Sequence, residues 1–478
     1  MSSPLPRRPS VTAMLPEKWG TSPFSPSPFF RQRPGRLAAP ARLAAVALAL
    51  LHAALACPAR AGEVEVLHFW ASGGEAQAVA QLKATLRANG HTWKDFAIAD
   101  GGGGLAVLML DSRVRSGNPP TAAQIKGVAI QEWARKGKLS GLDDVAGAER
   151  WNALLPQVIS DTMKYRGHYV AAPLNVHRVN WLWINADVLR KAGAKVPATW
   201  DEFFAAAEAI RRIGVTPVAY GGQSWLDLGT FESVAIGVGG VDFYKKAFLE
   251  LDRAALTSPA MEKTLETFKR LKSYTDQRNM GRDWVAATAM LNRGAAGMLI
   301  MGDWAKAEIL AAGKRPGIDI LCTATPGSRE AFSFDIDSIV LFDVSAEKKA
   351  AQRDLARAVM GRDFQQAFNL AKGSIPARLD VPLERFDACA RRARQDFQHS
   401  AKRGTLLPSL AHGMAQPSHT VAPMWDVVQQ FWNQDRMTAR EAMARLAAAA
   451  VPASLPVSPP ASLPAPAAAN RQRPPAAR

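Results

Sequence analysis

The side chains in this sequence that could do chemistry are aromatic and hydrogen-bonding residues beside glycines, at the expected ends of strands. Trp70 precedes Ser-Gly-Gly-Glu, Trp304 follows Gly-Asp, and Lys372 and His412 each precede a glycine. Loops at strand ends are where open α/β sheets bind ligands. An indole ring stacks on the apolar face of a pyranose, while charged groups hydrogen-bond its hydroxyls. The pattern therefore indicates a sugar site, and its members in chain order are Trp70, Glu75, Lys126, Trp304, Lys372 and His412.

Other kinds of site are not indicated. The histidines and cysteines lack C-x-x-C or H-E-x-x-H spacing, and no G-x-S-x-G motif is present, so we expect no metal, no cofactor and no catalytic serine. Gly101–Gly104 has neither dinucleotide-binding nor P-loop spacing, and it predicts a tight turn. Asp335 and Asp337 share one face of a strand, whereas glycosidase carboxylates flank a sugar from different elements, so at most one of them is expected in a site.

The charge of the chain lies mainly at its two ends. The formal charge of +17 divides into +7 on residues 1–61, +3 on residues 446–478 and +7 on the remaining body. The body has no stripe of lysine or arginine with interleaved aromatic residues, which argues against a nucleic-acid partner. A length of 478 residues suggests more than one domain.

The N-terminal part has the composition of a secretory signal. Arg36 and Arg42 precede the apolar stretch Leu43–Ala56, and Ala59-Arg60-Ala61 provides a small-residue cleavage site. The apolar stretch is shorter than the roughly 20 residues that span a bilayer, and the alternative is a buried helix. Because residues 1–35 precede this segment, translation could start at Met14 or later. We expect an exported, periplasmic protein.

Export changes how the three cysteines are interpreted. Cys57 lies in the signal region and offers a minor alternative, lipid anchoring of the mature chain. Cys322 and Cys389 remain, and an oxidising compartment favours a disulfide between them over two buried free thiols. From about Val451 the chain is rich in proline and alanine, so we expect a disordered tail.

Strands and helices alternate along the body, which predicts a mostly parallel α/β arrangement. Thr199 and Glu202 have the spacing of a capping box and mark a helix start. The remainder from 348 to 445 is expected to be helical. The expected strands are Glu63–Trp70, Phe96–Ala99, Tyr169–Leu174, Val179–Ile184, Val215–Tyr220, Ile318–Ala324 and Ser338–Phe342, and the first helices are Glu75–Ala88 and Leu105–Arg115.

Several long stretches of the body resemble one family, the extracellular solute-binding proteins of sugar ABC transporters, and within it the glucose/mannose-binding type of Gram-negative bacteria. The resemblance extends from about Glu65 to Ala444. Its most specific stretches are His68–Glu75 (HFWASGGE), Gly90–Asp95 (GHTWKD), Gly117–Gly127 (GNPPTAAQIKG), Asn175–Trp183 (NVHRVNWLW), Met301–Lys306 (MGDWAK) and Lys372–Pro376 (KGSIP).

The resemblance implies a two-lobed α/β periplasmic-binding-protein fold of type II, with a hinge of crossing strands and an interlobe cleft. The first lobe would comprise 62–174 and a returning segment, 327–366; the second would comprise 175–326 and 367–445. The chain would cross between the lobes near Leu174–Val176, near Thr323–Pro326 and before Lys372.

The resemblance also implies roles for individual residues. Trp70 and Trp304 would stack on the sugar from different lobes, and Gln223, Trp225 and His177 are further candidates. The family commonly has two tryptophans before Ser-Gly-Gly-Glu, but here the first is Phe69, which lacks an indole donor and puts affinity or sugar preference in question. The residues expected to bind hydroxyls are Glu75, Lys126, Asp337, Lys372 and His412.

On this basis we expect a monomeric binding protein, not an enzyme, that holds one monosaccharide and delivers it to a membrane permease. Glucose is favoured over mannose as the ligand. A disaccharide receptor of the same fold, a periplasmic glycoside hydrolase and a basic nucleic-acid binder are the alternatives.

Overall fold

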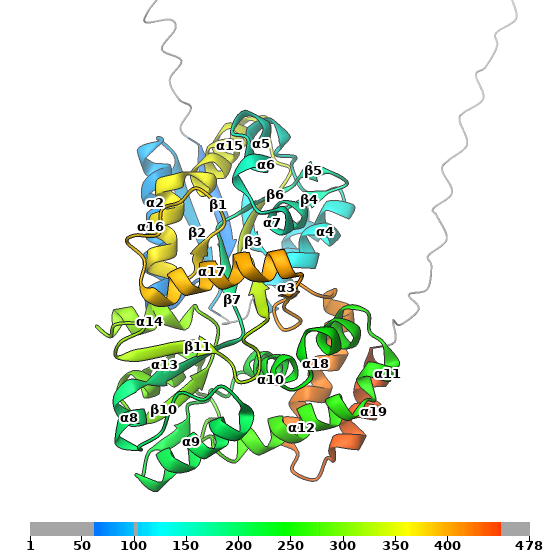
Figure 1. Cartoon of the computed structure of the whole chain (residues 1–478). Helices are drawn as coiled ribbons and strands as arrows, with labels where there is room; N and C mark the ends of the chain where they lie inside the picture. Colours follow the sequence, from blue (N-terminus) through cyan, green and yellow to red (C-terminus); the bar gives the residue numbers. More distant parts are fainter. Residues whose placement is uncertain (1–61, 100–103, 277, 451–478) are drawn as a thin grey trace, which may run out of the picture. The chain divides into compact units, whose positions relative to one another are not determined.

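A computed structural model describes residues 62–99, 104–276 and 278–450. The expected signal, Cys57 and the expected tail lie outside these residues. The buried apolar side chains form two separate clusters, so the described chain consists of two lobes (Figure 1). Lobe 1 is built from about 62–176 and 332–403, and lobe 2 from about 177–331 and 404–450.

Lobe 1 contains a five-stranded mixed sheet in the order β2-β1-β3-β13-β6. β1 runs parallel to β2 and β3, and β13 is antiparallel to β3 and β6. Its strands are β1 (Glu63–His68), β2 (Thr92–Ala97), β3 (Ala122–Ile125), β6 (Ala171–Pro173) and β13 (Ser338–Leu341).

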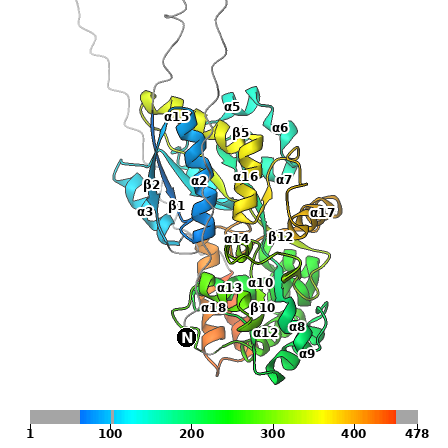
Figure 2. The ribbon, with the colours of Figure 1, turned by 90° about the vertical axis from the view of Figure 1, so that its left-hand side faces the viewer.

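Helices cover this sheet, and α2 and α16 pack along each other (Figure 2). Phe364 and Phe368 face the core from α16. A small hairpin joins β4 (Lys164–Tyr165) and β5 (His168–Tyr169). The helices of lobe 1 are α2 (Gly73–Ala88), α3 (Gly104–Arg115), α4 (Gly127–Arg135), α5 (Asp143–Ala148), α6 (Trp151–Leu154), α7 (Gln157–Thr162), α15 (Ala346–Met360), α16 (Arg362–Lys372) and α17 (Ala388–Arg403).

Lobe 2 contains a four-stranded sheet in the order β11-β8-β10-β9. β8 is buried along its whole length because it is a central strand, as its apolar sequence WLWIN favours. The strands are β8 (Trp181–Asn185), β9 (Thr216–Val218), β10 (Ala296–Ile300) and β11 (Ile320–Ala324).

Most of lobe 2 is helical. The predicted capping box is confirmed: the Thr199 hydroxyl accepts from the Glu202 amide, and the Glu202 carboxylate accepts from the Thr199 amide. The helices are α8 (Ala186–Lys191), α9 (Trp200–Arg212), α10 (Ser224–Tyr244), the π-helical η1 (Lys245–Leu249), α11 (Arg253–Leu256), α12 (Pro259–Lys272), α13 (Trp284–Asn292), α14 (Ala305–Ala311), α18 (Ser418–Asn433) and α19 (Ala439–Ala449).

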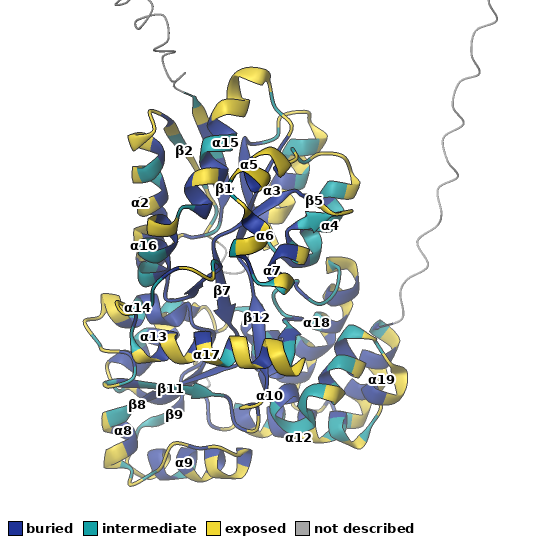
Figure 3. Cartoon of the chain, turned by 45° about the horizontal axis from the view of Figure 1, so that its top comes forward, coloured by how far each residue is buried: buried dark blue, intermediate teal, exposed yellow. Residues whose placement is uncertain are grey.

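A third sheet, in the order β14-β7-β12-β15, lies where the chain passes between the two cores. Its strands β7 and β12 are buried (Figure 3). On β7, Val176 belongs to the core of lobe 1, whereas Val179, just beyond it, belongs to that of lobe 2. The four strands are β7 (Asn175–Arg178), β12 (Phe332–Asp335), β14 (Ile375–Pro376) and β15 (Leu406–Pro408).

The later crossings differ from the sequence-based expectation. The second lies at Ala331–Phe332, after the expected Thr323–Pro326, because β11 keeps the chain in the sheet of lobe 2 through Ala324. The third lies near β15, because Phe368 and Phe397 pack in lobe 1. Residues 367–403 were expected in lobe 2; their helical periodicity gave no indication of which core they cover.

The predicted disulfide is confirmed. Cys322 on β11 is bonded to Cys389, with Cα atoms 6.1 Å apart. Helix α17 contacts β12, β14 and β15 and lies across the strands between the lobes (Figure 1). The bond therefore joins the sheet of lobe 2 to a helix whose Ala390 and Phe397 pack in lobe 1. Within the described ranges, no helix is long and apolar enough to cross a membrane.

Candidate functional site

A narrow cavity of about 50 Å³ lies between side chains of both lobes. Ten of the eleven candidate residues from the sequence line it; the other, Gln223, instead accepts a hydrogen bond from the Trp284 amide at the start of α13. A wider hollow of about 670 Å³ elsewhere gathers none of the predicted side chains. The residues lining the cavity are Phe69, Trp70, Glu75, Lys126, His177, Trp225, Trp284, Trp304, Asp337, Lys372, Ala411, His412 and Trp425.

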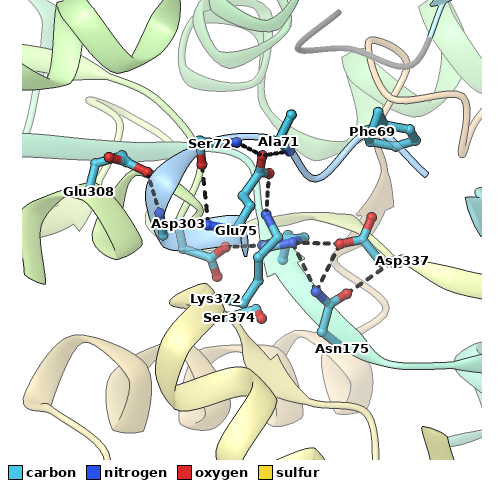
Figure 4. A network of polar contacts seen from close by, with 12 residues as sticks. Phe69, Ala71, Ser72, Glu75, Asn175, Asp303, Glu308, Asp337, Lys372 and Ser374 are labelled. Atoms are coloured by element: carbon cyan, nitrogen blue, oxygen red, sulfur yellow. Dashed lines mark hydrogen bonds and ion pairs between the residues drawn. The ribbon is translucent and has the colours of Figure 1, made fainter. Parts of the chain in front are cut away.

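Glu75 lies in the first turn of α2, where hydrogen bonds with neighbouring residues hold its side chain. Its Oε2 accepts from the amides of Ala71 and Ser72 at 3.2 and 3.3 Å, and the Ser72 hydroxyl accepts from the Glu75 amide (Figure 4). The other carboxylate oxygen, Oε1, accepts from Nζ of Lys372 at 2.9 Å. This capping box leaves Glu75 with one rigid orientation, pointing at the last residue of α16.

Lys126, directly after β3, pairs with two buried carboxylates. Its Nζ lies 2.5 Å from Oδ2 of Asp335 and 3.3 Å from Oδ1 of Asp337. Burial alone would lower the pKa of Lys126, but the two carboxylates raise it. Of the two, Asp337, which the resemblance favoured, lines the cavity, and Asp335 does not. Asp335 is wholly buried, and burial raises its pKa even though Lys126 opposes this.

His177 connects carboxylates of the two lobes. Its Nδ1 bonds to Oδ1 of Asp303, which precedes α14, and its Nε2 lies 3.1 Å from Oδ2 of Asp337. Asn175 donates to the same Asp337 oxygen at 3.0 Å and accepts from the Asp337 amide (Figure 4). Burial acts to lower the pKa of His177, but the charge of Asp303 raises it. Asp337 is thereby held from several sides.

Aromatic rings form the rest of the cavity wall. The rings of Trp304 and His412 lie 5.0 Å apart, and Trp225 lies 6.0 Å from Trp304. The indole N–H groups of Trp70 and Trp225 are buried and have no hydrogen-bond partner among the described residues. Lys126 lies over the ring of Phe69 at 5.1 Å, so the phenylalanine at this position contacts a cation of the site.

The sequence reasoning missed Trp284 and Trp425, which also line the cavity. Trp284 opens α13 directly after its N-cap residue, Asp283, and this cap is a signal that could have placed Trp284 at a helix end. Trp425 lies inside α18, where a tryptophan is ordinarily a core residue, and its Nε1 donates to the Ser224 carbonyl at 3.0 Å. The sequence of α18 gave no indication that Trp425 lines the cavity.

The site combines paired charges with aromatic surface. Lys372 is paired with Glu75, Lys126 with Asp335 and Asp337, and His177 with Asp303 and Asp337. Such a cavity offers hydrogen bonds from charged groups without a large unpaired charge, and this arrangement suits an uncharged polar ligand. In the part of the chain that the structure describes, no group of three or more residues could hold a metal ion.

Comparisons with known proteins give a consistent result. The family model for bacterial extracellular solute-binding proteins matches residues 75–357. A probable sugar-binding periplasmic protein of Brucella suis is 45% identical over 81% of this chain and 91% of its own length. A protein of the same name from Rhizobium meliloti is 45% identical over 84% and 96%. Among solved structures, the bacterial solute receptor AcbH, described as preferring β-D-galactopyranose, covers 81% of this chain and 97% of its own, with a TM-score of 0.69 and 19% identity.

Proposed function

We propose that this chain, which belongs to the bacterial extracellular solute-binding protein family, is the sugar-binding component of an ABC importer in the periplasm. The names of its relatives from Brucella and Rhizobium support both the sugar and the compartment. The family consists of binding proteins, so the chain is a receptor and not an enzyme. It acts as a monomer that delivers its ligand to a permease in the membrane.

The ligand we propose is a single neutral hexose, with glucose favoured over mannose. The observation that carries this proposal is the lining of the cavity: Trp70 from lobe 1 and Trp304 from lobe 2 stand beside the paired charges of Glu75 and Lys372. Indole faces suit the apolar face of a pyranose, and charged groups hydrogen-bond its hydroxyls. Phe69 supplies ring surface where the family commonly has a second indole donor, and this difference is expected to tune affinity or preference.

The cavity is too small for a sugar in this conformation. Its volume of about 50 Å³ has room for only a few water molecules. A hexose therefore enters only after the lobes separate, and a disaccharide needs a wider separation still. The described conformation corresponds to lobes that lie close together.

Ligand binding would act by favouring closure of the lobes. Side chains of both lobes reach a bound sugar only when the lobes lie together, so the sugar stabilises that state by its additional contacts. Gly74 on α2 already donates to Oε1 of Glu308 on α14 at 3.0 Å, a direct contact between the lobes (Figure 4). The closed surface is then what the permease recognises.

A pair of matched lysine variants tests the site. Lys372→Met removes the cation paired with Glu75 inside the cavity, whereas Lys83→Met removes one paired with Asp95 at the surface, at 2.5 Å. We expect titration with glucose, followed by tryptophan fluorescence, to show a loss of affinity of about 10-fold or more for Lys372→Met, because a charged hydrogen bond is worth about 1.5–3 kcal/mol. Lys83→Met should bind as the wild type does. Equal affinity for both variants, each shown to be folded by circular dichroism, would remove Lys372 from the site.

A further inference from the structure

A buried carboxylate outside the cavity lining, Glu232 on α10, is surrounded by hydrogen-bond donors. Its Oε1 accepts from the Ser333 hydroxyl at 2.5 Å, and its Oε2 accepts from the Ser409 hydroxyl at 2.9 Å and the Ala411 amide at 2.8 Å. Among the described residues no lysine, arginine or histidine forms an ion pair with it. Three neutral donors from β12 and the segment after β15 therefore hold one charge in the interior.

Because the Ser409 hydroxyl has a single proton, its bond to Glu232 determines how Ser409 can bond to His412. Ser409 Oγ also lies 2.9 Å from Nδ1 of His412. A hydroxyl has one proton to donate, and a carboxylate can only accept. When Ser409 donates to Glu232, its oxygen must accept from His412, and Nδ1 of His412 then carries the ring proton. The His412 amide donates to the same oxygen at 3.2 Å and holds the turn in place.

The other ring nitrogen of His412, Nε2, is available to a ligand in the cavity. His412 lines the cavity with its ring near those of Trp225 and Trp304, and the hydrogen bond that its side chain forms with a described residue uses Nδ1 and not Nε2. Burial and the charge of Lys126 hold the pKa of His412 well below its usual range, so the ring is neutral at physiological pH. With Nδ1 protonated, Nε2 presents a lone pair.

We propose that Glu232 is a positioning residue that acts through Ser409 to fix His412 as the Nδ1–H tautomer, so that Nε2 accepts a hydrogen bond from a sugar hydroxyl. This inference rests on the proposed function and adds to it a residue that does not touch the ligand. It assigns His412 the role of acceptor, whereas the ammonium groups of Lys126 and Lys372 can only donate. A sugar would then need a hydroxyl group whose proton faces His412.

The tautomer can be measured directly in the protein without any sugar. Nitrogen-15 NMR of the histidine-labelled full chain at pH 8 distinguishes a protonated ring nitrogen from an unprotonated one, and His412→Gln identifies the signals. Burial raises the pKa of Glu232 to about 7, so the carboxylate is ionised at pH 8. We expect a protonated Nδ1 and an unprotonated Nε2. A protonated Nε2 in the wild type overturns the proposal, whatever the protein binds.

Two variants test whether Glu232 causes this tautomer. In Glu232→Gln the amide oxygen should take the place of Oε2, which accepts from both Ser409 and the Ala411 amide, so this variant should keep the wild-type tautomer. In Glu232→Leu the acceptor is removed, the Ser409 proton can turn to Nδ1, and we expect His412 to change to the Nε2–H form. Glucose affinity should fall about 5- to 100-fold, because a hydroxyl then meets a donor where it met an acceptor. Ser409→Ala, a second variant, removes the relay oxygen and should give a mixture of tautomers with weaker binding.

The matched control is Asp227→Asn on the same helix. Asp227 is also buried, its pKa is also raised to about 7 by burial, and it accepts from the Tyr220 hydroxyl instead of Ser409. We expect this variant to keep both the wild-type tautomer and the wild-type affinity. An unchanged tautomer in Glu232→Leu and Ser409→Ala, with both variants folded by circular dichroism, or a changed tautomer with unchanged affinity, overturns the proposal. Absence of sugar binding by the wild type contradicts the proposed function instead, and leaves the tautomer result to be judged by itself.

Discussion

The substitution Lys126→Met tests how much the buried ion pairs of Lys126 with Asp335 and Asp337 stabilise the protein. In the wild type, Nζ of Lys126 lies 2.5 Å from Asp335 and 3.3 Å from Asp337, and both carboxylates are almost completely buried. Methionine keeps the unbranched apolar stem but removes the cation. Asp337 then retains the donors Gln124 and Asn175, whereas Asp335 loses its partner, and its Oδ1 already has none among the described residues.

The size of the effect follows from the burial of the pair. Removing one partner of a buried ion pair destabilises a protein by about 3–5 kcal/mol, because the remaining charge stays in a medium of low polarity. A native domain is stable by only about 5–15 kcal/mol, so this is a large fraction. Burial already raises the pKa of Asp335, and loss of Lys126 raises it further. A carboxyl with a raised folded-state pKa is destabilising when ionised, so the penalty should shrink as the pH falls and Asp335 takes up a proton.

The assay is urea unfolding of the sugar-free protein at pH 8 and pH 5, with Lys126→Met/Asp335→Asn as the compensating double variant. We expect the single variant to lose about 3–5 kcal/mol at pH 8 and less at pH 5. The double variant should recover much of the loss, because it restores the balance of charge. A loss below about 1 kcal/mol at pH 8, or a double variant that is no more stable than Lys126→Met, would refute the reasoning.

Two further predictions concern the contact between the lobes and the buried carboxylate of α10. A Cβ on Gly74 would lie 2.5 Å from that of Ala307, so we expect Gly74→Ala to weaken glucose binding by holding the lobes apart; calorimetry showing unchanged affinity would contradict this. Glu232 has its pKa raised by burial to about 7, so its proton stabilises the fold below about pH 4.5, and this contribution is lost as the pH rises to about 7. Between pH 4.5 and 8, Glu232→Gln should remove from the unfolding free energy a decline on the order of 3 kcal/mol, while the similar decline caused by Asp227 remains. An unaltered slope in the Glu232→Gln variant would contradict this prediction.

The sequence predicts those parts of the site whose geometry depends on residues close together in the chain. Ser72 and Glu75 form a capping box three residues apart, so their geometry follows from local helix chemistry and places Trp70 just before the helix. Asp337 was preferred to Asp335 because the family that the chain resembles has the pattern Ile-Asp-Ser at this point. Resemblance then added Asp337, Trp225 and His177, which no local rule connects to Trp70.

The parts that escaped prediction depend on contacts between distant residues. Asp303 is 126 positions from His177, and Glu232 is 177 positions from Ser409, so neither pairing has a pattern in the sequence. The same reason explains the position of the third crossing. Phe368 and Phe397 give α16 and α17 apolar faces, but a helical pattern does not say which of two cores the face will cover.

Calorimetric titration of the purified protein with D-glucose tests most directly the claim that the cavity between the lobes is a monosaccharide site. The account predicts binding with one site per chain, heat also from a hexose closely related to glucose such as mannose, and weaker or no heat from maltose. Absence of heat from glucose, mannose and galactose alike, with the protein folded by circular dichroism, would contradict it.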